Sequence, residues 1–128
     1  AYRIAQPADI PADDGFWLPY ATESFNMAVS SGSPVIIDFF AEWCAPCKKL
    51  DRITFSDTRV RSALEKTVRL KVDLTIYETP ESTELREKFG VSGVPTTIYL
   101  DSSGRERFRY EGFFPPEEIL RELSKIKS

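Results

Sequence analysis

The sequence of 128 residues contains no histidine and only two cysteines. Without histidine, neither Ser-His-Asp nor Cys-His catalysis is possible. Any proton transfer beside a reactive cysteine must therefore use a carboxylate, a lysine or water. A zinc site is the first alternative for the cysteines, but such sites usually take four ligands from Cys, His and carboxylates. We therefore expect no metal.

Long apolar runs and an excess of basic residues are also absent. No stretch approaches the ~18 apolar residues of a transmembrane helix, and no signal-peptide pattern is present. The net charge of −3 and the pI of about 5.1 give no indication of nucleic-acid or anionic-membrane binding. The hydrophobic content of 41% is sufficient for a core, and the length favours one domain. We place this domain at residues 16–128, after an arm or linker at residues 1–15.

The residues that are present centre on one stretch, a buried strand that leads into a helix. Val35–Phe40 is a short β-branched and aromatic run, typical of a strand covered on both faces. Cys44 follows near the start of a helix, where Pro46 is tolerated because the first turn has N–H groups without intrahelical partners. Cys47 lies three residues further and can bridge to Cys44. The helix start and Lys48 both favour a thiolate at Cys44.

Two further alternatives exist for this cysteine pair. A purely structural disulfide across three residues would close a very small loop and constrain the unfolded chain little. Two inert buried thiols would be unusual at a polar helix start. We therefore favour a redox-active dithiol, in which Cys44 is the more exposed nucleophile and Cys47 resolves the mixed disulfide.

Periodicity, caps and turn residues predict the remaining elements. Thr22 is expected to cap the first helix, Asp57 or Ser56 the third and Thr79 the fourth, which should stop at Gly90. Gly112 is expected at a bulge or at a close approach of the backbone. The expected helices cover residues 23–31, 44–53, 58–64, 80–89 and 116–126, and the expected strands cover 16–18, 35–40, 68–74, 96–100 and 106–110. For residues 16–18, the alternative is a loop with packed aromatics. This order predicts an α/β fold with a mixed central sheet and helices on both faces. Cys44 then lies at the carboxyl end of the central strand, where such sheets usually carry their sites.

Two motifs resemble the thioredoxin superfamily. Residues 38–48, DFFAEWCAPCK, resemble its active-site motif, and residues 93–96, GVPT, resemble its loop with a cis proline. The resemblance runs from about residue 20 to the end and implies a thioredoxin fold with a cis Val94–Pro95 bond. It also implies a docking surface for protein substrates and no cofactor beyond the Cys44–Cys47 disulfide. That surface comprises Trp43, Ala45, Pro46, Val94 and Pro95; for Trp43, the alternative is ordinary core packing.

Within this superfamily, the chain most resembles the C-terminal periplasmic domain of the DsbD family of transmembrane reductant conductors. Ile53–Asp57 resembles a segment that follows the active-site helix there, and Asp51 matches a second acidic position. The inner dipeptide Ala45–Pro46 is nearer to the Gly-Pro of thioredoxin. The resemblance implies a periplasmic, monomeric protein-disulfide reductase, linked to cytochrome c biogenesis. It would take electrons from a membrane-embedded dithiol and pass them to periplasmic partner proteins. The alternatives are a free-standing thioredoxin-like reductase, a cytochrome c maturation factor, and a non-catalytic binding or chaperone module.

Two carboxylates complete the candidate site. Asp38 interrupts an apolar strand, so we expect it buried behind Cys47, with a raised pKa, accepting the proton when Cys47 attacks. The alternative is an edge position that reaches water. Asp51 lies four residues after Cys47, on the same side of the helix. We expect it to join Asp38 in raising the pKa of Cys44 above the free value of about 8.5, and its alternative is a solvated surface residue.

Overall fold

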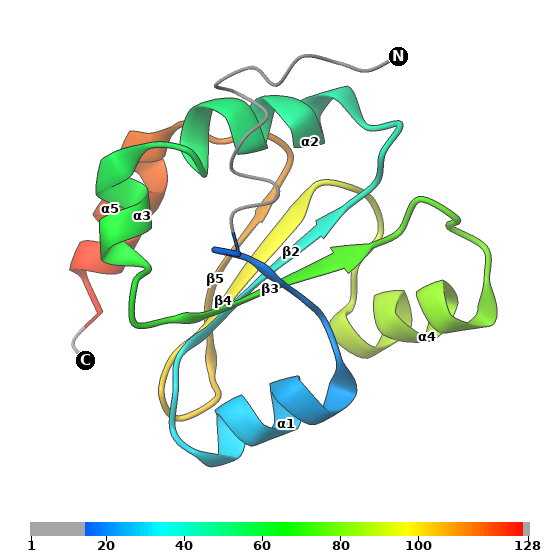
Figure 1. The fold of residues 1–128 in the computed structure, drawn as a ribbon, viewed down its shortest axis with the longest axis horizontal. Helices are drawn as coiled ribbons and strands as arrows, with labels where there is room; N and C mark the ends of the chain where they lie inside the picture. The colour runs from blue at the N-terminus through cyan, green and yellow to red at the C-terminus, as the bar shows by residue number, and fades with distance from the viewer. Residues whose placement is uncertain (1–14, 127–128) are drawn as a thin grey trace.

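The computed structural model describes residues 15–126, so the arm predicted at residues 1–15 lies outside the described residues except for Gly15. Figure 1 shows a sheet between two layers of helices. The strands are β1 (Leu18–Pro19), β2 (Val35–Phe40), β3 (Val68–Asp73), β4 (Thr96–Leu100) and β5 (Glu106–Glu111). The helices are α1 (Thr22–Ser30), α2 (Ala45–Lys49), the π-helical turn η2 (Leu50–Thr54), α3 (Thr58–Ala63), α4 (Pro80–Phe89) and α5 (Pro116–Ser124).

The sheet has the strand order β1-β3-β2-β4-β5. β1, β3 and β2 are parallel, whereas β4 runs antiparallel to β2 and to β5. α1 and α4 cover one face, and α2, α3 and α5 cover the other (Figure 1). The predicted mixed sheet with helices on both faces is therefore confirmed.

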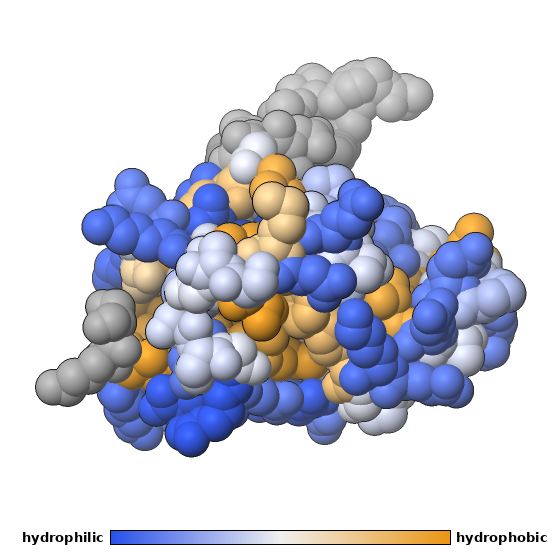
Figure 2. All heavy atoms as spheres, turned by 90° about the horizontal axis from the view of Figure 1, so that it is seen from below, coloured by the Kyte–Doolittle hydropathy of each residue, from blue (hydrophilic) through white to orange (hydrophobic). Residues whose placement is uncertain are grey.

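The central strand β2 is buried on both faces, which explains its nearly continuous apolar sequence. Val35, Ile37 and Phe39 pack in the core beneath α1 and α4, whereas Ile36 packs in the core beneath α2 and α5. Asp38 shares the second face, because side chains alternate along a strand. Figure 2 views the molecule from the α1 and α4 side, where hydrophilic residues surround hydrophobic residues that remain visible at the surface.

Most of the predicted caps are confirmed. Asp57 accepts hydrogen bonds from the backbone N–H groups of Arg59 and Val60, and Thr79 accepts one from Ser82. Gly90 ends α4 with a φ of 64°, a left-handed conformation that glycine adopts without steric cost. The prediction for Thr22 is wrong, because Thr22 is the first helical residue.

Ala21 occupies the N-cap position of α1 in an extended conformation and offers no side-chain hydrogen bond. The active-site helix also differs from the expected regular helix, since its second half is the wider π-helical turn η2. Gly112 adopts a φ of 100°, while the irregularity in the pairing of β4 and β5 lies where Tyr99 and Leu100 face Phe108 and Glu106.

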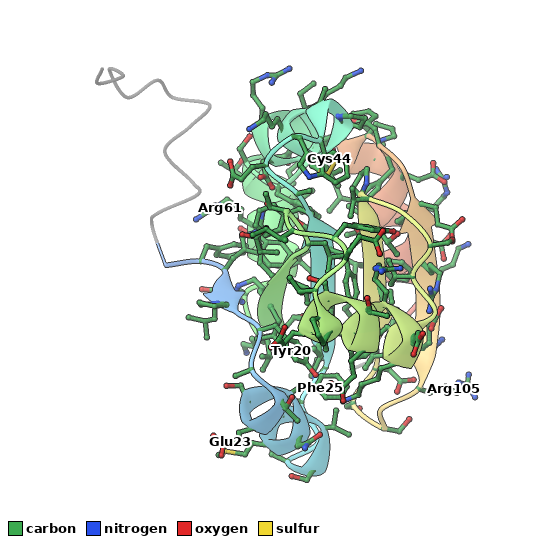
Figure 3. All side chains as sticks on the ribbon, turned by 90° about the vertical axis from the view of Figure 1, so that its right-hand side faces the viewer. Tyr20, Glu23, Phe25, Cys44, Arg61 and Arg105 are labelled. Atoms are coloured by element: carbon green, nitrogen blue, oxygen red, sulfur yellow. A yellow bond between two sulfur atoms is a disulfide. The ribbon has the colours of Figure 1, made fainter. Side chains whose placement is uncertain are left out.

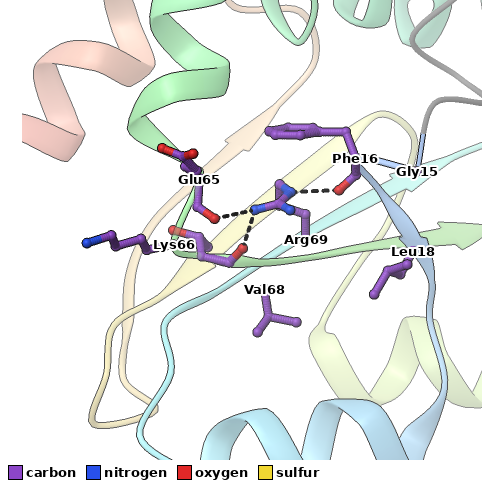
Figure 4. A pocket seen from close by; sticks show the side chains of 8 residues that line it. Gly15, Phe16, Leu18, Glu65, Lys66, Val68 and Arg69 are labelled. Atoms are coloured by element: carbon purple, nitrogen blue, oxygen red, sulfur yellow. Dashed lines mark hydrogen bonds between the residues drawn. The ribbon is translucent and has the colours of Figure 1, made fainter.

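At the β1 edge of the sheet, Arg69 of β3 hydrogen-bonds the segment that precedes β1. Its guanidinium donates hydrogen bonds to the carbonyls of Phe16, Leu64, Glu65 and Thr67 at 2.6–3.0 Å. It also lies 4.0 Å from the centroid of the Phe16 ring. A shallow hollow of about 290 Å³ lies beside this contact (Figure 4). None of the predicted site residues lines it.

Candidate redox site

Cys44 and Cys47 form a disulfide at the start of α2, with their Cα atoms 5.3 Å apart. Cys44 is the N-cap residue, and Pro46 lies in the first turn, where its missing N–H leaves no bond unmade. The Cys44 sulfur accepts a hydrogen bond from the backbone N–H of Cys47 at 3.1 Å. This donor and the helix start would both stabilise a thiolate on Cys44 after reduction.

Cys44 was expected to be more exposed than Cys47, but the two cysteines are equally buried. Each is 4% exposed in this disulfide form. Both sulfur atoms belong to one small buried cluster with Ala41, against which Phe40 and Val94 pack. The backbone position at the helix start, rather than exposure, therefore distinguishes Cys44 from Cys47.

The predicted cis peptide bond between Val94 and Pro95 is present. Pro95 is buried and Val94 is half-buried against the disulfide. Ala45 and Pro46 are exposed at the helix start. The disulfide is thus flanked by exposed helix residues on one side and by the half-buried Val94 on the other.

Trp43 is 60% exposed, so the core-packing alternative for this residue is wrong. Its indole N–H donates a hydrogen bond to the carbonyl of Thr75 at 2.9 Å. Its ring meets that of Tyr77 edge-on, with the centroids 6.4 Å apart. The indole is thereby held in a fixed orientation beside Cys44, with most of its surface available to a partner.

Asp38 and Asp51 both bind Lys71. Asp38 is 2% exposed and its Oδ2 lies 3.1 Å from the Lys71 ammonium. Asp51 is 33% exposed and accepts two hydrogen bonds from the same ammonium at 2.7 and 2.9 Å. Lys71 also lies over the Phe40 ring, 4.7 Å from its centroid. The three charged groups therefore connect β2 and β3 to η2, the second half of the active-site helix.

Burial of Asp38 raises its pKa to about 6, although Lys71 opposes this shift and Asp51 adds to it. For Lys71, burial acts against the charged form, but the two carboxylates outweigh it and raise the pKa of the ammonium. The predicted burial of Asp38 and its raised pKa are confirmed. The edge-position alternative is wrong, since β2 is the central strand. The Oδ1 atom of Asp38 is buried and has no hydrogen-bond partner among the described residues, so it is free to accept a proton.

The alternative for Asp51, a solvated surface residue, is wrong, because Asp51 is 33% exposed and paired with Lys71. Its ion pair with Lys71 partly neutralises the charge that was expected to act on Cys44. The positive charge expected from Lys48 is also reduced, because its ammonium lies 3.7 Å from the Glu42 carboxylate. Because both of these side chains are more than half exposed, water and salt screen their ion pair, and Glu42 lowers the effect of Lys48 on Cys44 only slightly.

Lys71 is the residue of the site that the sequence analysis did not identify. The register of β2 and β3 places it directly beside Asp38. β3 alternates apolar and charged residues, so Lys71 by itself gives no signal; the available signal was an aspartate within the apolar strand β2, which requires a cation on a neighbouring strand. Pairing the two strands in that register would have found it.

A family model described as a thioredoxin-like domain matches residues 21–127 of the chain. The chain belongs to the thioredoxin-like domain family. A thioredoxin from Thermus thermophilus is 32% identical, with a TM-score of 0.69 over 85% of this chain and 84% of that chain. The thioredoxin fold expected from the two motifs is thereby confirmed.

Among curated relatives, the thiol:disulfide interchange protein DsbD of Ralstonia nicotianae is 38% identical over 104 residues, or 80% of this chain. DsbD of Photorhabdus laumondii is 40% identical over 102 residues, or 78%. The thioredoxin-like chain spans only 17% and 18% of these two relatives. The C-terminal domain of Neisseria meningitidis DsbD, in its reduced form, shares the fold with a TM-score of 0.71 at 22% identity, over 86% of this chain and 100% of that chain.

The expected resemblance to DsbD is therefore confirmed at the level of this domain. Within residues 15–126, no helix has the length and apolar character needed to cross a bilayer.

Proposed function

We propose that this domain is a thiol–disulfide oxidoreductase that works as a reductant through Cys44 and Cys47. The observation that carries the proposal is the disulfide at a helix start, against which Val94 of the cis-proline loop packs, together with a buried carboxylate on the strand that leads into this helix. The reduced domain gives two electrons to a partner disulfide. The products are two partner thiols and the Cys44–Cys47 disulfide.

The reaction has two displacement steps. The Cys44 thiolate attacks one partner sulfur, so that one Cys44–partner bond forms and the partner disulfide breaks. The other partner sulfur leaves in this first step as a thiolate that takes a proton from water. Cys47 then loses its proton to Asp38 and attacks the Cys44 sulfur, so that the Cys44–Cys47 bond forms, the Cys44–partner bond breaks, and the partner sulfur held by Cys44 leaves as a thiolate that is protonated by water. Trp43 and the Val94–Pro95 loop, with Ala45 and Pro46, form the surface on which the partner chain docks.

The similarity to DsbD supports a more specific role. We propose that a membrane-embedded dithiol reduces this domain and that periplasmic protein disulfides, including those of cytochrome c biogenesis, oxidise it. In this proposal the domain is monomeric and periplasmic. The support is the 38% identity to a protein whose name describes thiol–disulfide interchange.

A free-standing thioredoxin-like reductase is the second candidate. The Ala45–Pro46 dipeptide and the 32% identity to the Thermus thermophilus thioredoxin favour it. The full-length gene decides between the two, because membrane spans beside this domain would favour the DsbD-like role.

Insulin reduction tests the shared chemistry. With dithiothreitol as electron source, the domain is expected to accelerate precipitation of the insulin B chain well above the uncatalysed rate. A Cys44→Ala/Cys47→Ala double variant supplies the background. Equal rates for the two proteins would instead favour a non-catalytic binding module on the same fold.

Asp51 gives a separate prediction about Cys44 in the reduced domain. Asp51→Asn removes one negative charge and leaves Lys71 to Asp38 alone, so the thiolate of Cys44 should become easier to form. The pH midpoint of Cys44 alkylation is expected to fall by roughly half a unit to one unit from the wild type to the variant. Glu65→Gln makes the same charge change near the other end of β3 and should leave the midpoint unchanged. A wild-type midpoint near 7 that Asp51→Asn does not move would show that these carboxylates do not hold Cys44 as a thiol.

A further inference from the structure

The loop between β3 and α4 presents an exposed apolar side chain next to the redox site. Ile76 is 70% exposed, and Trp43, which is hydrogen-bonded to the neighbouring Thr75, is 60% exposed. β2 and β3 are parallel, so the loops that follow them leave the sheet at the same end (Figure 1). Ile76 therefore belongs to the surface that surrounds Cys44.

This loop is held rigidly, although it is exposed. Three successive carbonyls each accept a hydrogen bond from outside the loop: Thr75 from the Trp43 indole, Ile76 from the Ser82 hydroxyl, and Tyr77 from Arg86, at 2.9–3.1 Å. The Arg86 guanidinium also stacks over the Tyr77 ring, 4.0 Å from its centroid.

Asp73 and Glu42 add to this network through Thr75. Asp73 caps the loop by accepting a hydrogen bond from the Thr75 backbone N–H at 2.9 Å. The Thr75 hydroxyl oxygen accepts one from the backbone N–H of Glu42 at 2.9 Å. Because the backbone is already fixed, a partner that covers Ile76 would lose little conformational entropy in doing so.

Carboxylates outnumber cations around Ile76. Residues 72–85 contain four carboxylates and no lysine or arginine. All four are exposed, and Glu42, whose carboxylate lies 3.7 Å from the Lys48 ammonium, is a further exposed carboxylate next to Trp43. Arg86, the next cation along the chain, is partly buried by its stacking on Tyr77. This excess of negative charge around Ile76 favours a partner that carries positive charge.

We propose that Trp43, Ile76 and these carboxylates form a docking platform for a polypeptide that carries an apolar residue and a lysine or arginine beside its disulfide. The proposal rests on the proposed function, since it names the protein substrates of the same site. The apolar residue packs against Ile76 and the Trp43 ring, while the basic residue lies opposite Glu78 and Glu81. The platform thereby selects among disulfides that Cys44 could otherwise attack equally well.

Peptide disulfides of defined sequence test the platform. Two synthetic peptides share one internal disulfide with a flanking leucine and differ only in a Lys or a Glu next to that leucine. Reduced wild-type domain is expected to reduce the Lys peptide roughly fivefold faster at about 10 mM salt, where charges are poorly screened. The preference should shrink at about 1 M salt and in a Glu78→Gln/Glu81→Gln variant.

Ile76→Ser is expected to slow both peptides roughly fivefold, because it removes apolar contact area. Met27→Ser is the matched control. Met27 is equally exposed, at 70%, but lies on α1, at the end of the molecule opposite Cys44 (Figure 3). The small aromatic disulfide 5,5′-dithiobis(2-nitrobenzoic acid) is too short to span the platform. At about 1 M salt, where its two carboxylates are screened, it should react equally with every variant, which shows that fold and thiol chemistry are intact.

Equal rates for the Lys and Glu peptides at low salt, or an unchanged rate in Ile76→Ser, would overturn the platform while leaving the reductase in place. A wild-type domain that reduces neither peptide nor the small disulfide would overturn the proposed function, and the platform with it.

Discussion

The Cys47→Ala variant is expected to accumulate a mixed disulfide between Cys44 and its protein substrate, and Cys44→Ala is expected to lose reductase activity completely. Cys44 is the N-cap residue of α2 and its sulfur accepts the Cys47 backbone N–H at 3.1 Å. Both features favour the thiolate, which is the attacking species. Without the Cys47 thiol, the second displacement has no intramolecular nucleophile, so the covalent complex should persist.

The measurement is non-reducing electrophoresis after incubation with insulin, with mass spectrometry of the trapped species. The trapped band should disappear on treatment with dithiothreitol. Cys44→Ala is the matched control, because it also retains a single cysteine, in the same buried cluster and with the same 4% exposure in the wild-type disulfide. Trapping of equal efficiency by both single variants would contradict the assignment of roles, since exposure alone does not separate the two sulfur atoms.

Much of the fold could be predicted from local sequence because local residues determine it. The buried run Val35–Phe40 specifies a central strand without reference to any other segment. Asp57, Thr79 and Gly90 act on backbone groups within a few residues of themselves, so their capping roles are visible in the sequence. Thr22 shows the limit of such signals: the helix begins one residue earlier, with Ala21 as its cap.

The features that escaped prediction depend on how segments distant in sequence meet. The alternation of Val68, Leu70 and Val72 predicts a strand, but gives no reason to bury the intervening Lys71. Lys71 joins the site only because β3 pairs with β2 in a register that brings it beside Asp38. The equal burial of Cys44 and Cys47 likewise depends on Phe40 and Val94, which pack against the disulfide from the central strand and a remote loop.

Asp38→Asn is expected to have two effects of opposite sign, slower catalysis and higher stability. Asp38 is buried, and burial raises its pKa to about 6 against the opposing effect of Lys71. The folded protein therefore holds this proton more tightly than the unfolded chain, whose value is 3.8. Stability due to this group is fully present below pH 3.8 and falls as the pH rises from there through about 6.

At pH 7 the ionised Asp38 then costs on the order of 3 kcal/mol of folding free energy. Asparagine cannot ionise, so urea denaturation should show a variant that is more stable than the wild type at pH 7 by up to about that amount. The two proteins should converge near pH 4. A variant that is less stable than the wild type at pH 7 would contradict the buried, ionised Asp38 of the structure.

The kinetic effect distinguishes a catalytic carboxylate from one that only affects stability. Stopped-flow measurement of mixed-disulfide resolution should show a wild-type rate that rises with pH through about 6 and then levels, because only ionised Asp38 accepts the Cys47 proton. Asp38→Asn should lack this rise and resolve roughly 100-fold more slowly at pH 7, within the range typical of general-base catalysis.

Lys71→Met sharpens this test by leaving Asp38 in place while removing the charge that lowers its pKa. The midpoint of the rise should then move above pH 6, toward higher pH, with the limiting rate at high pH largely kept. A purely structural role for Asp38 predicts no such displacement. If the wild-type resolution rate is flat from pH 5 to 8 and Asp38→Asn does not change it, then Asp38 sets only the stability of the domain, and Cys47 must lose its proton to water.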